Sequence, residues 1–148
     1  GLSLMTLSTR RVRDTRNFHA QASIFSAAVV ALSATSGDGG VFAWQNPTHQ
    51  PIIITRVTID ITTAAPATVT IDVGTTANGA SASDNLIDGG GIAATGVLDN
   101  IEDRGTNGKS RQRLAGLGGA TDFVTGTASA APTGLVGFAY IEYIVTRS

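Results

Sequence analysis

The chain has 148 residues and no cysteine, which predicts one domain and excludes disulfides and thiolate chemistry. Hydrophobic residues make up 42% of the sequence and charged residues only 14%, so the composition disfavours disorder. The net charge of −1 argues against nucleic-acid binding by the whole protein, and no apolar run approaches the roughly 20 residues of a membrane-spanning helix.

The first 25 residues are predicted to form an extended N-terminal arm. Four of the ten basic residues fall within seven positions of it, with one acid, Asp14, among them. These basic residues are Arg10, Arg11, Arg13 and Arg16. Apolar residues are sparse here and follow neither a helical nor a strand period. Such clustering is typical of an arm that lies on an acidic or polar partner or on nucleic acid, and a frayed, solvated terminus is the alternative.

The segment 51–73 indicates the fold class. Its two runs, 57–62 and 68–73, alternate β-branched apolar residues with short polar ones. Strict alternation is typical of a strand with one buried and one solvated face. Because Pro66 in the link cannot continue a ladder, the two runs are predicted to form a β-hairpin.

Further strands are expected on both sides of this hairpin. The segment 26–33 is compatible with a helix or a strand, and we favour a strand. The other predicted elements are a strand at 41–44, a brief element at 84–88 that the following glycines stop, a strand and turn at 97–103, and strands at 122–127 and 135–145. The last run is apolar in both alternating sets apart from Glu142, so we expect it to be covered on both faces, by its own sheet or by a neighbouring subunit.

The pattern of about six to eight short strands without an amphipathic helix predicts an all-β protein. An antiparallel β-sandwich or jelly roll is expected, with a β-barrel as the alternative. The domain is expected to span 26–148, preceded by the arm at 1–25.

No combination of residues predicts catalysis or a cofactor site. His19 and His49 have no partner at ligand or triad spacing, so surface histidines are expected. Asp60 and Asp72 occupy matching places on the predicted hairpin, where paired carboxylates could perform acid–base chemistry, but solubility and edge protection explain them more simply.

Two acidic groups in Gly-rich loops offer oxygen ligands of the kind that calcium binds. They are Asp84 with Asp88, and Asp99 with Asp103. Neither has EF-hand spacing, and Asx turns at strand ends explain both equally well.

A second basic group follows these acids. It consists of Arg104, Lys109, Arg111 and Arg113. A surface that carries both signs in neighbouring loops can pair head to tail with a copy of itself around a symmetry axis. A solvated loop with internal ion pairs is the alternative.

Five segments resemble the capsid decoration, or cement, proteins of tailed bacteriophages. They are Val-Phe-Ala-Trp-Gln-Asn-Pro (41–47), Ile-Asp-Val-Gly-Thr-Thr-Ala (71–77), Ser-Asp-Asn-Leu-Ile-Asp-Gly (83–89), Asp-Asn-Ile-Glu-Asp-Arg-Gly-Thr-Asn-Gly-Lys (99–109) and Leu-Val-Gly-Phe-Ala-Tyr-Ile-Glu-Tyr (135–143). The resemblance covers about residues 26–146. It implies a jelly-roll-like body, often trimeric, that binds the outside of a capsid shell and bridges capsomers. An N-terminal arm, here about 6–22, would reach along the shell or to a neighbouring copy.

The resulting hypothesis is a non-enzymatic virion structural protein on the outer capsid surface, with the major capsid protein as its partner. The arm residues Arg10, Arg11, Arg13, Arg16 and Phe18 would contact the shell, and Arg104, Lys109, Arg111 and Arg113 would contact a sister subunit. No cofactor, membrane or direct nucleic-acid contact is expected. The alternative is a carbohydrate-binding head-fibre or tail-fibre module that uses Trp44, Tyr140 or Tyr143. An enzyme such as a glycosidase domain has no supporting constellation.

Overall fold

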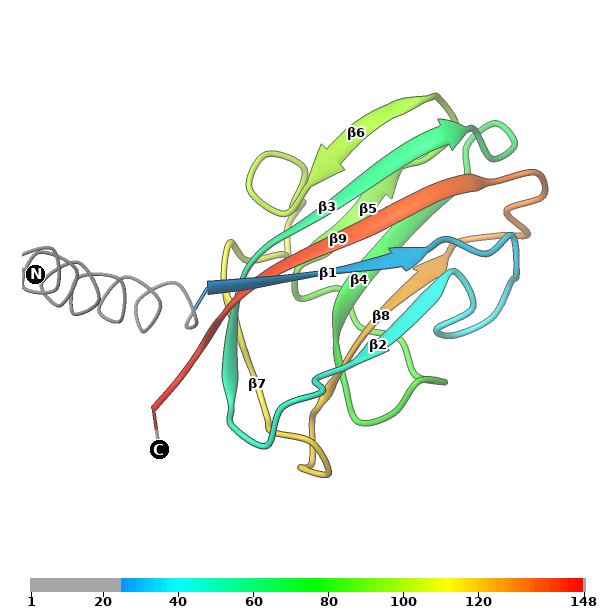
Figure 1. Ribbon diagram of the computed structural model, residues 1–148. Coiled ribbons are helices and arrows are strands. Elements are labelled where there is room, and N and C mark those ends of the chain that lie inside the picture. The colour runs from blue at the N-terminus through cyan, green and yellow to red at the C-terminus, as the bar shows by residue number, and fades with distance from the viewer. Residues whose placement is uncertain (1–24, 148) are drawn as a thin grey trace, which may run out of the picture.

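The computed structural model describes residues 25–147, which form two packed antiparallel β-sheets (Figure 1). This confirms the predicted all-β sandwich. No helix in the described part of the chain could span a membrane. The strands are β1 (Phe25–Ala31), β2 (Phe42–Gln45), β3 (Ile52–Thr63), β4 (Thr70–Thr76), β5 (Ile87–Gly91), β6 (Gly96–Asp99), β7 (Gln112–Leu114), β8 (Phe123–Ala128) and β9 (Val136–Val145).

The strand order is that of a jelly roll. One sheet has the order β1-β9-β3-β6, with β7 also paired to β3, and the other has the order β2-β8-β4-β5. The antiparallel pairs are nested along the chain as in one long hairpin, in which early strands pair with late ones. From the outside inward, these pairs are β1–β9, β2–β8, β3–β6 and β4–β5. Folding this hairpin over on itself brings β3 against β9 and β4 against β8, which completes the two sheets.

The predicted hairpin between 57–62 and 68–73 is wrong, because β3 and β4 belong to opposite sheets. Their link crosses from one sheet to the other, and Thr68 within it has a positive φ of 70°. The alternating apolar residues of the two strands instead face the core between the sheets, where Ile59 and Ile71 are fully buried. Alternation determines which side of a strand faces the core, but it does not determine the neighbouring strand.

The glycine run after Asp88 continues β5 instead of stopping it. Gly90 is buried, and a Cβ placed on it would lie 2.8 Å from Leu98 Cδ1 and 2.9 Å from Ile87 Cγ2. Glycine is therefore the residue that lets β5 pass beneath the leucine of β6. The expectation of a stop was wrong because the absent side chain provides room for packing here.

The side chain of Asn100 fills the gap between β6 and β7, which pair with different parts of the same edge of β3. Asn100 is fully buried. Its Oδ1 accepts a hydrogen bond from the Val57 N–H (2.7 Å), and its Nδ2 donates to the Lys109 carbonyl (2.9 Å). The amide thus replaces the missing strand partner of β3 and holds the loop that carries Lys109.

We expect Asn100→Ala to lower the free energy of unfolding by about 1–3 kcal/mol, because it leaves a buried N–H and a carbonyl without partners. Asn107→Ala is the matched control. Asn107 lies in the same loop and is exposed, and its side chain donates to Asp84 Oδ2, so a loss below about 0.5 kcal/mol is expected. Urea denaturation of both variants measures the difference, and equal losses would contradict this role of Asn100.

Candidate interaction surface

The outer face of the β1-β9-β3-β6 sheet exposes large apolar side chains. In β9, Ala139 and Ile141 point inward and are fully buried, whereas Val136, Phe138 and Tyr140 are 51%, 40% and 37% exposed. Within the described chain, β9 is therefore covered on one face and not on both. Apart from Glu142, its outward residues are apolar although nothing in the described chain fully covers them.

The antiparallel register extends this apolar surface onto β1. Val29 lies opposite Tyr140 and is 60% exposed, and Ala31 lies opposite Phe138. The rings of Phe138 and Tyr140 are 6.4 Å apart and tilted by 46°. We use the name apolar strip for five of the outward apolar residues of β1 and β9. They are Val29, Ala31, Val136, Phe138 and Tyr140.

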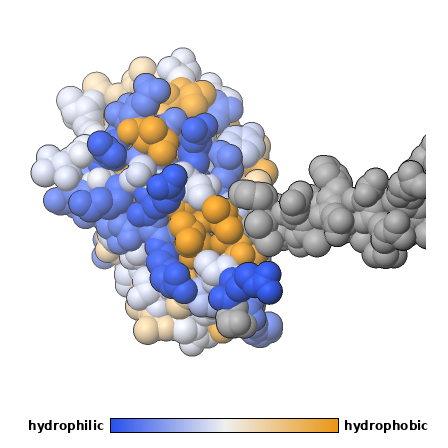
Figure 2. Space-filling view, turned by 90° about the vertical axis from the view of Figure 1, so that its left-hand side faces the viewer, coloured by the Kyte–Doolittle hydropathy of each residue, from blue (hydrophilic) through white to orange (hydrophobic). Residues whose placement is uncertain are grey.

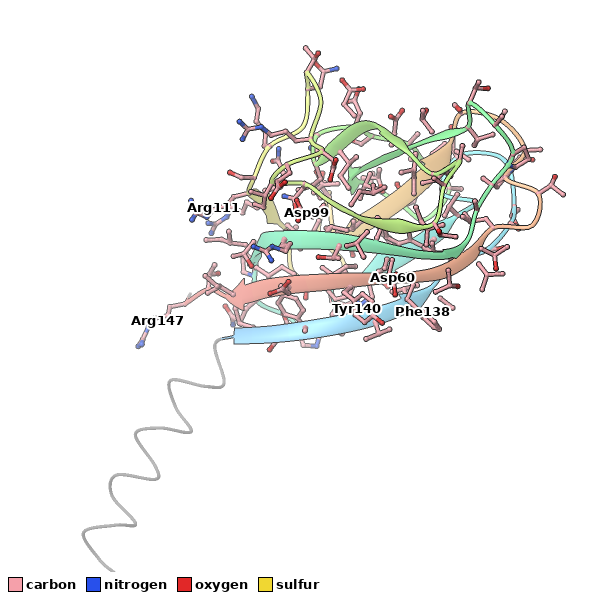
Figure 3. The ribbon with its side chains drawn as sticks, turned by 90° about the horizontal axis from the view of Figure 1, so that it is seen from above. Asp60, Asp99, Arg111, Phe138, Tyr140 and Arg147 are labelled. Atoms are coloured by element: carbon pink, nitrogen blue, oxygen red, sulfur yellow. The ribbon has the colours of Figure 1, made fainter. Side chains whose placement is uncertain are left out.

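Charged residues lie at both ends of the same face. Figure 3 shows Asp60 beside Phe138 and Tyr140, while Arg111 and Arg147 lie at the opposite end. The register agrees, since Asp60 of β3 is directly opposite Phe138. Figure 2 shows the end of the sandwich where β1 begins and β9 ends, and there an apolar area is bordered by hydrophilic residues. The outer face therefore carries exposed apolar side chains with charged residues at both of its ends, and an apolar area with a polar border is typical of protein-binding surfaces.

The predicted subunit-contact residues are all exposed and lie in and beside β7. They are Arg104, Lys109, Arg111 and Arg113. Among residues 25–147, no ion pair joins these cations to a carboxylate. The neighbouring acid Asp99 instead accepts hydrogen bonds from the N–H groups of Ile101 and Glu102 (2.8 and 2.9 Å), as in an Asx turn. The alternative with internal ion pairs thus has no support in the described chain.

The acidic residues considered for calcium hold loops together. Asp84 Oδ2 accepts from Asn107 Nδ2 (3.0 Å), and Asp88 Oδ2 accepts from the Asn107 N–H (3.1 Å). Asp72 and Asp84 also line a shallow hollow of about 270 Å³. Burial raises the pKa of Asp72, the Gly89 N–H opposes this shift, and the charges of Asp88 and Asp84 add to it. Within the described residues, no group of three or more acidic or histidine side chains is placed to hold a metal ion.

Asp60 and Asp72 are not a carboxylate pair. They project from β3 and β4, which lie in opposite sheets, and the residues on either side of each carboxylate point into the core. Both aspartates therefore face away from the core on opposite sides of the sandwich. The acid–base interpretation is wrong because it required a hairpin that does not form.

The three aromatic residues considered for carbohydrate binding do not form one site. Trp44 packs on Tyr143 with ring centroids 5.4 Å apart, and Tyr143 is buried. Tyr140 belongs to the apolar strip on the outer face. His49 is exposed in its loop, as expected, and His19 and the arm residues from Arg10 to Phe18 lie outside the described residues.

The other buried polar side chains support the fold rather than a site. Asp122 Oδ2 accepts hydrogen bonds from Gln45 Nε2 (2.8 Å) and from the Gly118 N–H (2.9 Å), which ties the end of β2 to the loop before β8. The bond from Gln45 lowers the pKa of Asp122 most strongly, burial opposes it, and the Gly118 N–H lowers it further.

No family model and no curated protein matches the chain. Among solved structures, the chain is similar to one titled "Capsid of Ralstonia phage GP4". The identity is 14%, the match covers 84% of this chain and 86% of that chain, and the TM-score is 0.47.

The lowered pKa of Asp122 predicts a pH-dependent contribution to stability. The carboxylate stabilises the fold above the unfolded-state pKa of 3.8, and this contribution is lost as the pH falls through the lower folded-state pKa. We expect Asp122→Asn to lower the free energy of unfolding by about 1–2 kcal/mol at pH 6, with the difference shrinking below pH 3.8. Denaturation curves between pH 2 and pH 7 measure this. The exposed Glu102→Gln is the control, and a deficit of Asp122→Asn that does not shrink in acid would contradict the assignment.

Proposed function

We propose that the chain is a non-enzymatic structural protein of a tailed-phage virion that binds the outer surface of the capsid. It contacts the major capsid protein and bridges capsomers as a decoration, or cement, protein. The observation that carries this proposal is the apolar strip on the outer face of the jelly roll. The sequence resemblance of five segments to decoration proteins supports the same class.

The strip suits a broad protein partner better than a small ligand. Small molecules are bound in concave pockets that bury most of their surface. Val29, Phe138 and Tyr140 instead stand on one face of a sheet, in adjacent strands. Contiguous apolar patches on soluble proteins commonly mark protein–protein contacts, and aromatic side chains supply much of the binding energy there.

The charge distribution supports separate roles for the arm and the body. Residues 1–24 contain four arginines and one aspartate, a net charge of +3, which leaves six basic and ten acidic residues, a net charge of −4, for 25–148. The arm residues, including Phe18, are proposed to contact the shell. Oppositely charged surfaces guide such contacts and determine their orientation.

Copies of the chain are proposed to form trimers through the loops beside β7. Arg104, Lys109, Arg111 and Arg113 have no ion-pair partner in the described chain, so they can meet Glu102 and Asp103 of a sister subunit. A head-to-tail contact forms a ring when the rotation between neighbouring copies closes, and the proposed trimer is such a ring.

The carbohydrate-binding alternative has less support, since Tyr143 is buried beneath Trp44 and Tyr140 stands apart from both. A sugar site would need these aromatic faces to be exposed together.

The strip can be tested with the double variant Phe138→Ser/Tyr140→Ser and shells of the phage that encodes the chain. We expect at least about a tenfold loss of shell affinity, because aromatic residues at the centre of an interface each contribute on the order of 1–2 kcal/mol or more. The control is Ile101→Ser/Leu117→Ser, since these side chains are 38% and 40% exposed, almost as Tyr140 and Phe138 are, but lie outside the strip. Co-sedimentation with shells measures both, and equal binding by the two variants would overturn the role of the strip.

The arm can be tested by deleting residues 1–20, which we expect to remove most shell binding. A full-length variant with Arg10, Arg11, Arg13 and Arg16 changed to glutamine tests the charges alone. Its residual binding should depend less on salt, because charge contacts are screened as ionic strength rises. A truncated protein that decorates shells at wild-type occupancy would contradict the arm assignment.

A further inference from the structure

The strand β1 is an open edge of its sheet in the described chain. It pairs only with β9, in an unbroken register from Phe25 opposite Ile144 to Ala31 opposite Phe138. The Leu32 N–H donates to the Gly137 carbonyl (2.9 Å), which continues this ladder and fixes its alternation. The even-numbered residues therefore direct their N–H and C=O groups toward β9. Those of Ala27, Val29 and Ala31 point away from the sheet and have no partner among residues 25–147.

The other sheet edges carry features that block further pairing, and β1 carries none. The edge strand β6 has four residues and ends in Asp99, and β2 also has only four. The edge strand β5 contains Asp88 and pairs with β4 through a register shift. By contrast β1 has seven residues, Phe-Ser-Ala-Ala-Val-Val-Ala, with no charge, proline, glycine or bulge. A long, apolar, unprotected edge is a template for another strand.

We propose that β1 pairs with β1 of a second copy of this chain, antiparallel about a two-fold axis that passes beside Ala28. Only this register pairs all seven residues of both strands, Ala27 opposite Val29 and Phe25 opposite Ala31. In this register the N–H and C=O groups of the odd-numbered residues, which point away from β9, bond to those of the second copy. Side chains that face outward in one copy lie beside side chains that face outward in the other. The two strands then form about eight main-chain hydrogen bonds, within the range of an ordinary protein–protein interface.

Two further observations fit a second copy at this edge. Ala28 and Val30 on the inner side of β1 are only partly buried against the core, so a neighbouring strand would complete their burial. The apolar strip of one copy would also continue into that of the other across paired Ala27 and Val29. The contact lies at the opposite edge of the sheet from β6 and β7, so it can coexist with a trimer contact through the loops at 104–113.

A cysteine at position 28 tests the register directly, since the chain contains no other cysteine. Directly opposite residues in a non-hydrogen-bonded antiparallel pair have Cα atoms about 4.5 Å apart, within the range that a disulfide spans. We expect full-length Ala28→Cys to form a disulfide-linked dimer under mild oxidation. In Ala31→Cys the two cysteines would lie about 20 Å apart along the strands, so that variant should remain unlinked although position 31 is more exposed. Equal cross-linking of both variants, or none in Ala28→Cys, would overturn the proposal.

A matched pair of lysine variants tests the edge without oxidation. Val29 and Val97 are 60% and 65% exposed on the outer face of the same sheet, on its opposite edges β1 and β6. We expect Val29→Lys to weaken two-fold association at least tenfold in sedimentation equilibrium, and Val97→Lys to leave it unchanged. Hydrogen exchange adds a third readout. A protected Val29 amide in a protein without two-fold association would mean that residues 1–24 or another partner occupy the edge, which would also overturn the proposal. No shell is needed in any of these experiments, so failed capsid binding would leave the inference standing.

Discussion

The ladder between β3 and β9 is the interaction on which the two sheets depend. It joins residues that are 93 positions apart at one end, where Ile52 is opposite Val145, and 73 positions apart at the other, where Thr63 is opposite Val136. Each strand then carries a further neighbour, β1 on β9 and both β6 and β7 on β3. Burial of their inward side chains against the second sheet stabilises the fold by roughly 1.5–3 kcal/mol for each large aliphatic residue. This central pair therefore contributes a large part of the hydrophobic core. The buried Asn100 fills the gap between β6 and β7, where the edge of β3 lacks a strand partner.

The alternation of β-branched and polar residues was enough to predict the fold class and the inward faces of β3 and β4, while the apolar runs at 26–33 and 135–145 predicted the strands at the two ends of the domain. It could not predict which strands are neighbours, because a strand with one apolar face can pair within a sheet or pack across a core with the same sequence. The false hairpin and the false carboxylate pair of Asp60 and Asp72 share this origin. The prediction that the glycines stop β5 was wrong for a different reason. Gly90 leaves room for the side chain of Leu98, and this contact between distant residues cannot be seen in a local sequence pattern.

The candidate surface could be predicted only in part. The signal was present in the run 135–145, which is apolar in both alternating sets, and a covering neighbour was one of the two explanations that it allowed. The contribution of β1 was missed, because Val29 and Ala31 join Phe138 and Tyr140 only through a pairing between the first and last strands. The basic residues at 104–113 were found by charge alone, and the fold adds that they lie at the far edge of the same sheet from β1.

The place of β9 in the sheet also bears on how the protein is made. The ninth strand along the chain, β9, is an interior strand, inserted between β1 and β3 (Figure 1). Until residues 136–145 have been synthesised, β1 has no strand to pair with and one side of β3 is open. Because translation adds roughly 5–20 residues per second, the nascent chain exposes apolar strand edges for seconds. Folding of the sandwich therefore has to wait for residues 136–145, and its many long-range pairings place it among the slower-folding topologies.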